Sequence, residues 1–171
     1  PRRRGPAPRS RSSVPESFRS RLARWGFNWF PAYRGTGARI EYVASDWKEV
    51  RIRLPLSWRT RNYVGTIYGG SLYGAIDPIY MIMLIKILGP DYVVWDKTAA
   101  IRFRKPGRST LRATFRLEDP ELEAIRTDVH ANGKTERTYV VELKDPGGEV
   151  CMRCEKLLSI KARKLDKAPD L

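Results

Sequence analysis

The chain has 171 residues, and its 42% hydrophobic and 30% charged content is typical of one ordinary globular domain. Two cysteines and one histidine, His130, exclude a four-ligand zinc site, which needs more nitrogen and sulfur ligands. The formal net charge of +14 is concentrated at one end, because residues 1–40 contain ten arginines and a single acid, Glu16. Such a basic field favours an anionic partner, namely nucleic acid, an anionic membrane surface or a phosphate-bearing substrate.

The first 36 residues are predicted to form two parts that precede the main domain. Residues 1–13 are rich in arginine, proline and serine, which indicates a flexible basic arm or, alternatively, an organellar transit-like segment. In residues 14–36 we expect an amphipathic helix and a linker. Ser13 and Glu16 have capping-box spacing, Pro31 ends the pattern, and the apolar stripe consists of Phe18, Leu22, Trp25 and Trp29. We expect this stripe to pack on the domain rather than to bind a membrane.

The next 50 residues predict two strands followed by one long helix. Residues 39–44 and 50–54 have strand-like patterns, and a polar loop then leads to Gly69-Gly70. The segment from Leu72 to Ile87 is apolar on every side, and its length favours a helix over a strand. A helix of this kind must be enclosed by other structure.

Strands dominate the remainder of the chain. Residues 92–104, 110–117 and 150–160 and the surroundings of Tyr139 predict strands, whereas residues 121–131 predict a short helix closed by Gly133. The order predicts an α+β domain over residues 37–164, in which one antiparallel sheet curls around the apolar helix. Residues 165–171 form a C-terminal tail.

No membrane span, disulfide or cofactor is expected. The longest apolar run, Ile76 to Leu88, is shorter than the ~20 residues of a membrane span, and no secretory signal is visible. Cys151 and Cys154 are three residues apart in a predicted strand, so they face opposite sides and cannot share a metal or a disulfide. We therefore expect a cytoplasmic protein with both thiols reduced.

This arrangement resembles the hotdog fold, and one local motif strengthens the resemblance. Asn62 is followed after five residues by Tyr68-Gly69-Gly70 and after six more by Asp77. Hotdog thioesterases of the phenylacetate-degradation type carry Asn-x5-His-Gly-Gly-x6-Asp with the same spacing. The stretch from Lys97 to Pro106 is also similar, and so is the start of the last strand at Gly148. The chain looks most like the uncharacterised thioesterase-like branch of the superfamily, a domain-of-unknown-function-4442-like group.

The resemblance implies catalytic roles for Asn62, Tyr68, Gly69 and Asp77. The backbone N–H of Gly69, with Gly70 as a further donor, would stabilise the oxyanion, and Asp77 would act as general base or nucleophile. The family's histidine is Tyr68 here, so only a hydrogen-bond-donating role carries over to it, because a phenol is a poor base at neutral pH. Asn62 could equally be a loop-turn residue.

Asp77 also has a purely structural interpretation. Asp77-Pro78 is a good N-cap followed by proline in the first turn, so Asp77 could simply start a helix. If the helix instead begins near Gly70, Pro78 lies inside it, leaves the carbonyl of Gly74 unpaired and bends the helix. The resemblance favours the second arrangement.

The remaining candidates concern substrate binding. Asp96, or Thr98 if the register slips, would face the catalytic acid, although Asp96 could be an exposed acid beside Lys97. Leu72 and Ile76 would line the acyl chain together with strands of a partner subunit. The cations that could contact the CoA phosphates, or could simply form a solvated face, are Arg102, Arg104, Lys105 and Arg108.

Three functions remain open from the sequence. The first is an acyl-CoA thioesterase without a cofactor, in which CoA is part of the substrate and the site lies at the interface of a homodimer or a dimer of dimers. The second is a hotdog protein that binds an acyl ligand or assembles without turnover. The third is a nucleic-acid or ribonucleoprotein component that binds through the basic arm.

Overall fold

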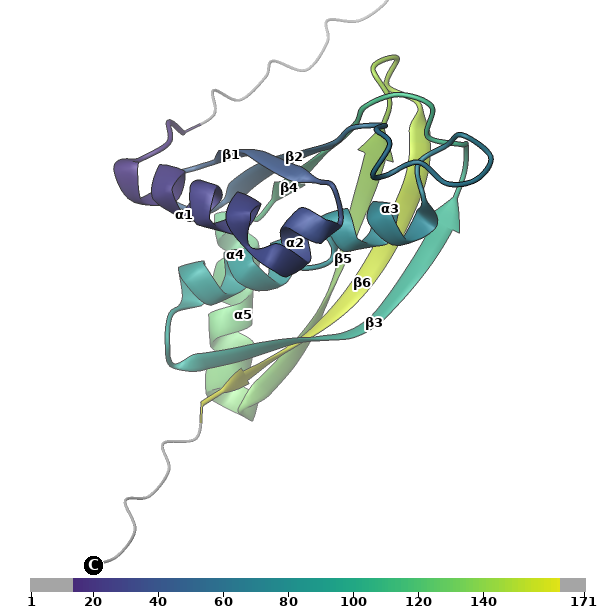
Figure 1. Ribbon diagram of the computed structural model, residues 1–171. Coiled ribbons are helices and arrows are strands. Elements are labelled where there is room, and N and C mark those ends of the chain that lie inside the picture. Colours follow the sequence, from purple (N-terminus) through teal and green to yellow (C-terminus); the bar gives the residue numbers. More distant parts are fainter. Residues whose placement is uncertain (1–13, 164–171) are drawn as a thin grey trace, which may run out of the picture.

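A six-stranded antiparallel sheet curls around one bent helix in the computed structural model, which describes residues 14–163 (Figure 1). The predicted arm, residues 1–13, and the predicted tail, residues 165–171, lie outside the described residues. The helices are α1 (Phe18–Trp29), α2 (Pro31–Gly35), α3 (Gly69–Ile76), α4 (Ile79–Leu88) and α5 (Asp119–Asn132). The strands are β1 (Arg39–Val43), β2 (Glu49–Leu54), β3 (Tyr92–Phe103), β4 (Leu111–Arg116), β5 (Lys134–Lys144) and β6 (Val150–Ala162). The predicted α+β hotdog arrangement is confirmed.

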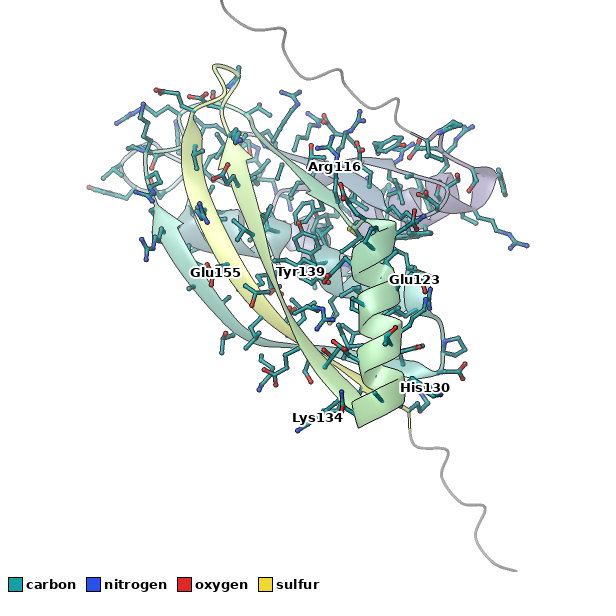
Figure 2. The ribbon with its side chains drawn as sticks, turned by 180° about the vertical axis from the view of Figure 1, so that it is seen from behind. Arg116, Glu123, His130, Lys134, Tyr139 and Glu155 are labelled. Atoms are coloured by element: carbon teal, nitrogen blue, oxygen red, sulfur yellow. The ribbon has the colours of Figure 1, made fainter. Side chains whose placement is uncertain are left out.

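The strands follow the spatial order β1-β2-β4-β5-β6-β3, so β1 and β3 are the two edges of the sheet. The long strands β3, β5 and β6 pair along nearly their whole length, whereas β4 and β5 share one register pair, Arg112 with Lys144. Helix α5 connects these two strands and runs alongside β5 (Figure 2). It is held there by buried Leu122, Ile125 and Val129 and by Tyr139, whose hydroxyl donates to Glu121 at 3.1 Å.

The central helix begins at Gly69 and is interrupted at Asp77-Pro78, where α3 passes into α4. Asp77 has a helical backbone and its amide donates to the Tyr73 carbonyl, so it lies within the bent helix. Its side chain does not cap α4, whose N-cap is Pro78 without a side-chain hydrogen bond. The capping interpretation of Asp77 is therefore wrong, and the bend has the expected cause, since a proline has no N–H to donate.

The central helix Gly69–Leu88 has the length and the mean hydropathy, 1.5, of a candidate membrane span. Half of that stretch is buried inside the domain, where residues such as Ile76, Met83 and Leu84 form the core against the sheet. Enclosure is incomplete, because Ile85 on the outer side of α4 is exposed. Core packing therefore explains the apolar character of the central helix.

The N-terminal helix differs from the prediction at both ends and in its orientation. Its N-cap is Ser17 rather than Ser13, because Ser17 and Ser20 form the reciprocal capping box, while Glu16 binds Arg24. Pro31 does not only end a helix: it opens the short helix α2. The predicted packing of the aromatic stripe on the domain is wrong, since Phe18, Leu22, Trp25 and Trp29 are all exposed.

Candidate functional site

The central feature of the site is a buried cation on β6. Lys156 is fully buried, and its ammonium lies 3.0 Å from Asp77 Oδ1 and 3.0 Å from Asp96 Oδ2. The same Nζ also donates to the backbone carbonyl of Asp77. A buried ammonium requires compensation of this kind, because an unpaired charge in the interior costs several kcal/mol. Three elements, the bend of the central helix, β3 and β6, are thus joined by one side chain.

The strand register places Asp96, rather than Thr98, on the side that faces this cluster. Asp96 pairs with Leu158 on the inner side of β6, but the register shifts between Asp96 and Thr98, so Thr98 pairs with Leu157. Because strand faces alternate, this irregularity directs Thr98 to the outer face. Asp96 is not a freely exposed turn acid: its side chain is largely buried and bound to Lys156, while neighbouring Lys97 binds Glu136.

The two carboxylates have different environments. Burial raises the pKa of Asp96, and the hydrogen bond and charge of Lys156 oppose this effect without cancelling it. Oδ1 of Asp96 is buried and has no hydrogen-bond partner among the described residues. Asp77 keeps 42% of its side chain exposed. Asp77 is therefore the member of the cluster that a ligand can reach.

A tyrosine one helical turn earlier completes the surroundings of Asp77. Burial, and next the interaction with the Asp77 carboxylate, raise the pKa of Tyr73, so its phenol stays protonated beside that carboxylate. The ring of Tyr73 also lies 5.9 Å from Lys156 Nζ. The carboxylate of Asp77 is thus held by the Lys156 ammonium, with Tyr73 close to both groups.

The second half of the site is the start of α3. Tyr68 is its N-cap, and its side chain makes no capping hydrogen bond to the amides of the first turn, which begins at Gly69. A pocket of about 370 Å³ opens here, lined by Asn62, Gly69, Leu72, Phe103, Arg104 and Lys105 among others. A Cβ on Gly69 would lie 3.3 Å from the Phe103 ring, so glycine permits close approach at this position. Backbone donors at a helix start favour an anion or a developing oxyanion.

Asn62 lines this pocket, whereas Tyr68 is not among its lining residues and lies against Gly70. The carboxamide oxygen of Asn62 accepts from the amides of Val64 and Thr66, and its nitrogen donates to the Thr66 hydroxyl at 2.9 Å. These bonds are those of a loop-turn residue. The ring of Tyr68 lies against Gly70, where a Cβ would be 2.3 Å from it, and its hydroxyl has no hydrogen bond among the residues described.

The predicted substrate contacts divide into two groups. Leu72, Arg104 and Lys105 line the pocket with Gly69, and Lys105 is also paired with Glu149. Ile76 is fully buried in the core, and Arg108 is exposed outside this pocket. Arg102 pairs in register with Arg153 on the outer face of the sheet and lines a hollow with Arg104 and Glu155. The two cysteines are buried and free, and residues 14–163 contain no cluster of three or more potential metal ligands.

Within one chain the two halves of the site are separated. Asp77 follows Gly69 by eight residues of helix, which at ~1.5 Å per residue places them about 12 Å apart along the axis. Groups that act on one carbonyl must each lie about 3 Å from it. One copy of the chain therefore cannot apply both to the same substrate carbonyl.

Lys156 and Tyr73 are the site residues that sequence reasoning missed. The inner face of β6 carries alternate residues, among them Met152, Cys154 and Leu158, and Lys156 occupies the same parity. A lysine at an inward position of an apolar strand is a detectable signal, because it needs an acidic partner inside. Which acid that is depends on tertiary structure.

Comparisons with solved structures support the fold. A Pseudomonas aeruginosa protein of unknown function, described as a "probable thioesterase", superposes with TM-score 0.76 and 24% identity over 88% of this chain and 99% of its own. A Chlorobaculum tepidum protein of unknown function superposes with TM-score 0.69 and 17% identity over 90% of this chain and 100% of its own. A Haemophilus influenzae thioesterase superposes with TM-score 0.64 and 13% identity over 91% of this chain and 99% of its own.

Sequence comparison places the chain more specifically. No curated protein matches it by sequence. The sequence profile of DUF4442, a domain of unknown function, matches residues 19–160, which include the whole central helix and every strand except the last two residues of β6. The chain therefore belongs to the DUF4442 family, and it has the hotdog fold.

Proposed function

We propose that the protein hydrolyses an acyl-CoA-type thioester, with Asp77 as the catalytic carboxylate and the start of α3 as the oxyanion site. The observation that carries the proposal is the Asp77 carboxylate, which is 42% exposed yet held at 3.0 Å by a fully buried lysine. Placing a carboxylate in an apolar helix costs free energy that packing does not explain. Such groups concentrate at functional sites. Proteins named thioesterases share the fold, which supports the reaction class.

The oxyanion role of α3 follows from its uncapped first turn. As the thioester carbonyl is attacked, negative charge develops on its oxygen, and preorganised donors aimed at that oxygen lower the barrier. The amide of Gly69, with that of Gly70, supplies such donors at the positive end of a helix. The Tyr68 hydroxyl, which has no other partner among the described residues, is a further donor on the side chain that lies against Gly70.

Asp77 provides the second requirement, either by accepting a proton from water or by attacking the carbonyl to form an anhydride. In both cases Lys156 and Tyr73 are positioning residues, since they fix the carboxylate without touching the substrate. Incorporation of ¹⁸O from labelled water into Asp77 during a single turnover identifies direct attack, because the label enters when water opens the anhydride at the aspartyl carbonyl. General-base catalysis places the label only in the released acid.

A complete site requires two copies of the chain. Because Gly69 and Asp77 are about 12 Å apart on one helix, the oxyanion donors of one copy must meet the carboxylate of another. Strand β3 offers a surface for this pairing, as it is a sheet edge of twelve residues whose outer backbone groups have no strand beside them within residues 14–163. Asp96 of this strand binds Lys156, so an approaching copy would lie beside the Asp77 cluster.

The pocket at Gly69 suits a thioester that carries phosphates. Arg104 and Lys105 lie on its rim, where they can contact CoA phosphates, and Phe103 and Leu72 supply an apolar wall. Arg102 and Arg108 would act as more distant contributors to the field. Ile76 is enclosed in the core, so we assign the acyl chain to Leu72, Phe103 and the facing copy.

The direct test is thiol release from acyl-CoAs of different chain lengths by wild type and by Asp77→Asn. The amide keeps the size of the side chain but cannot act as base or nucleophile. We expect kcat to fall by roughly 10²–10⁴-fold. The matched control is Asp91→Asn, an exposed acid in the turn after α4, which should leave kcat unchanged.

A complementation experiment tests the shared site. Asp77→Asn and Gly69→Val should each be inactive alone, the second because the new side chain meets Phe103 and blocks the amide. When the two are unfolded and refolded together, half of the dimers are mixed and carry one intact site. About a quarter of wild-type activity should therefore return. No recovery from mixed dimers of confirmed stoichiometry would contradict a site formed by two copies.

A second candidate, acyl-ligand binding without turnover, is favoured by two observations. Tyr68 occupies the histidine position of the resembling thioesterases, and Lys156 already engages the carboxylate that would act. This alternative predicts saturable acyl-CoA binding, measured by calorimetry, with no thiol release from any chain length. That result would exclude the hydrolase.

A further inference from the structure

The outer face of α1 is an exposed apolar stripe that the proposed function does not use. Phe18, Leu22, Trp25 and Trp29 are 78%, 58%, 60% and 55% exposed, respectively. At ~100° per residue they fall within an arc of about 60°, so they form one continuous ridge along three turns. The rings of Trp25 and Trp29 lie 5.9 Å apart, and Phe30 continues the surface beyond the helix end.

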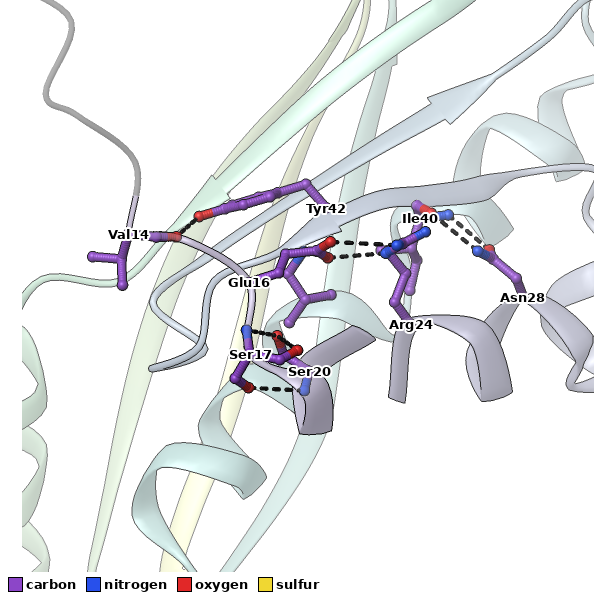
Figure 3. Close-up of polar contacts among 9 residues, drawn as sticks. Val14, Glu16, Ser17, Ser20, Arg24, Asn28, Ile40 and Tyr42 are labelled. Carbon is purple, nitrogen blue, oxygen red and sulfur yellow. Dashed lines mark hydrogen bonds and ion pairs between the residues drawn. The ribbon is translucent and has the colours of Figure 1, made fainter. Parts of the chain in front are cut away.

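Polar contacts on the opposite face fix this orientation (Figure 3). The Asn28 carboxamide accepts from the Ile40 amide at 2.8 Å and donates to its carbonyl at 3.0 Å. Arg24 is paired with Glu16, which also accepts from the amide of Val43. Ser20 is buried against the domain. The helix is therefore held on strand β1 by a specific polar face, and its large apolar residues are directed outward.

Cations flank the stripe. Arg19 and Arg21 are exposed and flank it, and the guanidinium of Arg34 lies 4.9 Å from the centre of the Trp29 ring. The sequence just before α1 adds five arginines and no acid within residues 1–13. The only acid of the first forty residues, Glu16, is already neutralised by Arg24. The surface is thus apolar at its centre and positive at its margins.

We propose that α1 docks the protein on an anionic lipid membrane, with the stripe in the headgroup–acyl boundary and the arginines on the lipid phosphates. Tryptophan, phenylalanine and leucine on one face with arginines beside them are the composition of helices that lie in a membrane interface. The proposal is independent of thioester hydrolysis. It assigns to α1 a partner that satisfies both its apolar and its cationic groups.

Two other occupants fit the surface less well. A second copy seated symmetrically on the stripe would bring Arg19 and Arg21 against arginines of its partner, and like charges across an interface are repulsive. A nucleic acid would pair with the arginines and stack on the tryptophans, but it would leave Leu22 beside a charged backbone. A membrane accommodates every exposed side chain of the helix.

The test measures binding of the full chain to phosphatidylcholine vesicles with and without phosphatidylserine, by cosedimentation and tryptophan emission. We expect binding to the anionic vesicles, a shift of emission to shorter wavelength, and weakening as salt is raised. Trp25→Ser/Trp29→Ser should reduce the partition coefficient at least ~10-fold. Arg19→Gln/Arg21→Gln should reduce it on the order of tenfold on anionic vesicles only.

The matched control is Trp58→Ser. Trp58 is 83% exposed and lies outside α1, and the Arg59 guanidinium lies 5.6 Å from its ring, so its replacement removes an equivalent tryptophan–arginine pair. Vesicle binding should be unchanged. The proposal is overturned by absent vesicle binding, or by equal loss in the control and the stripe variants. It is also overturned if the stripe variant instead abolishes a dimer seen by light scattering or the binding of a single-stranded oligonucleotide.

Discussion

Lys156 is the residue on which the interior electrostatics of the domain depend. It lies between two carboxylates, one largely buried and one open to solvent, so the cluster carries two potential negative charges for one positive charge. The buried member is the one whose pKa is raised, since losing hydration disfavours its ionised form. The open member, Asp77, is therefore the carboxylate of the cluster that a ligand can reach.

Removing the ammonium should destabilise the fold strongly. Lys156→Met keeps the length of the side chain but leaves Asp77 and Asp96 without a cation. Breaking a buried ion pair in this way costs about 3–5 kcal/mol, which urea unfolding measures directly. Lys161→Met is the matched control, because Lys161 is exposed on the same strand and should change stability by less than ~0.5 kcal/mol. Equal effects of the two substitutions would contradict the assigned role.

Asp96 should make stability depend on pH in a direction opposite to that of most acids. Its native pKa lies above its ordinary value of 3.8, so above pH 3.8 the folded state binds more protons than the unfolded state. The free energy of unfolding contributed by this group is therefore greatest below that pH and falls as pH rises through the native pKa. Asp96→Asn removes this decline.

The measurement is urea unfolding of wild type and Asp96→Asn over a pH series from about 4 upward. The stability of the variant relative to wild type should increase with pH. Asp91→Asn, at an exposed acid, should run parallel to wild type. A stability difference between Asp96→Asn and wild type that is independent of pH would show that Asp96 is not buried as described.

At the scale of elements, the edge strand β3 and the bent helix α3–α4 position the site together. Pro78 bends the helix at the point where Lys156 binds the Asp77 carbonyl. The ammonium therefore compensates for the interrupted backbone hydrogen bonding of the helix. The register shift in β3 after Asp96 turns Thr98 outward, while Asp96 faces the lysine. Both irregularities meet at the same lysine.

Pairing through β3 gives a prediction at this scale. Ala99 lies in the exposed central part of the strand, and Ala99→Glu would bring like charges together if two copies pair there antiparallel. We expect the dimer to dissociate, as measured by size-exclusion chromatography with light scattering, and thiol release to be lost with it. Ala124→Glu, the same change on the exposed face of α5, should leave the oligomeric state unaltered. A dimer that survives Ala99→Glu would exclude β3 as the interface.

For the whole molecule, the domain separates two surfaces of different character. One contains the Gly69 pocket, the Asp77 cluster and the β3 edge. The other is the aromatic ridge of α1, attached to β1 at the opposite edge of the sheet. Most of the excess positive charge lies on the side of α1. Cations on the outer face of the sheet are largely paired with acids such as Glu41, Glu49 and Glu142.

The sequence by itself determined the order of elements, the bend at Pro78 and the two glycines that open α3. Each of these follows from local chemistry: the period of apolar residues, the missing proline N–H and the freedom of glycine. Tertiary structure alone decided that Lys156 binds Asp77 and Asp96, because contacts between residues 79 positions apart depend on strand register. It also decided the orientation of α1, since the bonds of Asn28 and Glu16 to β1 outweigh an amphipathic pattern that had indicated the opposite face.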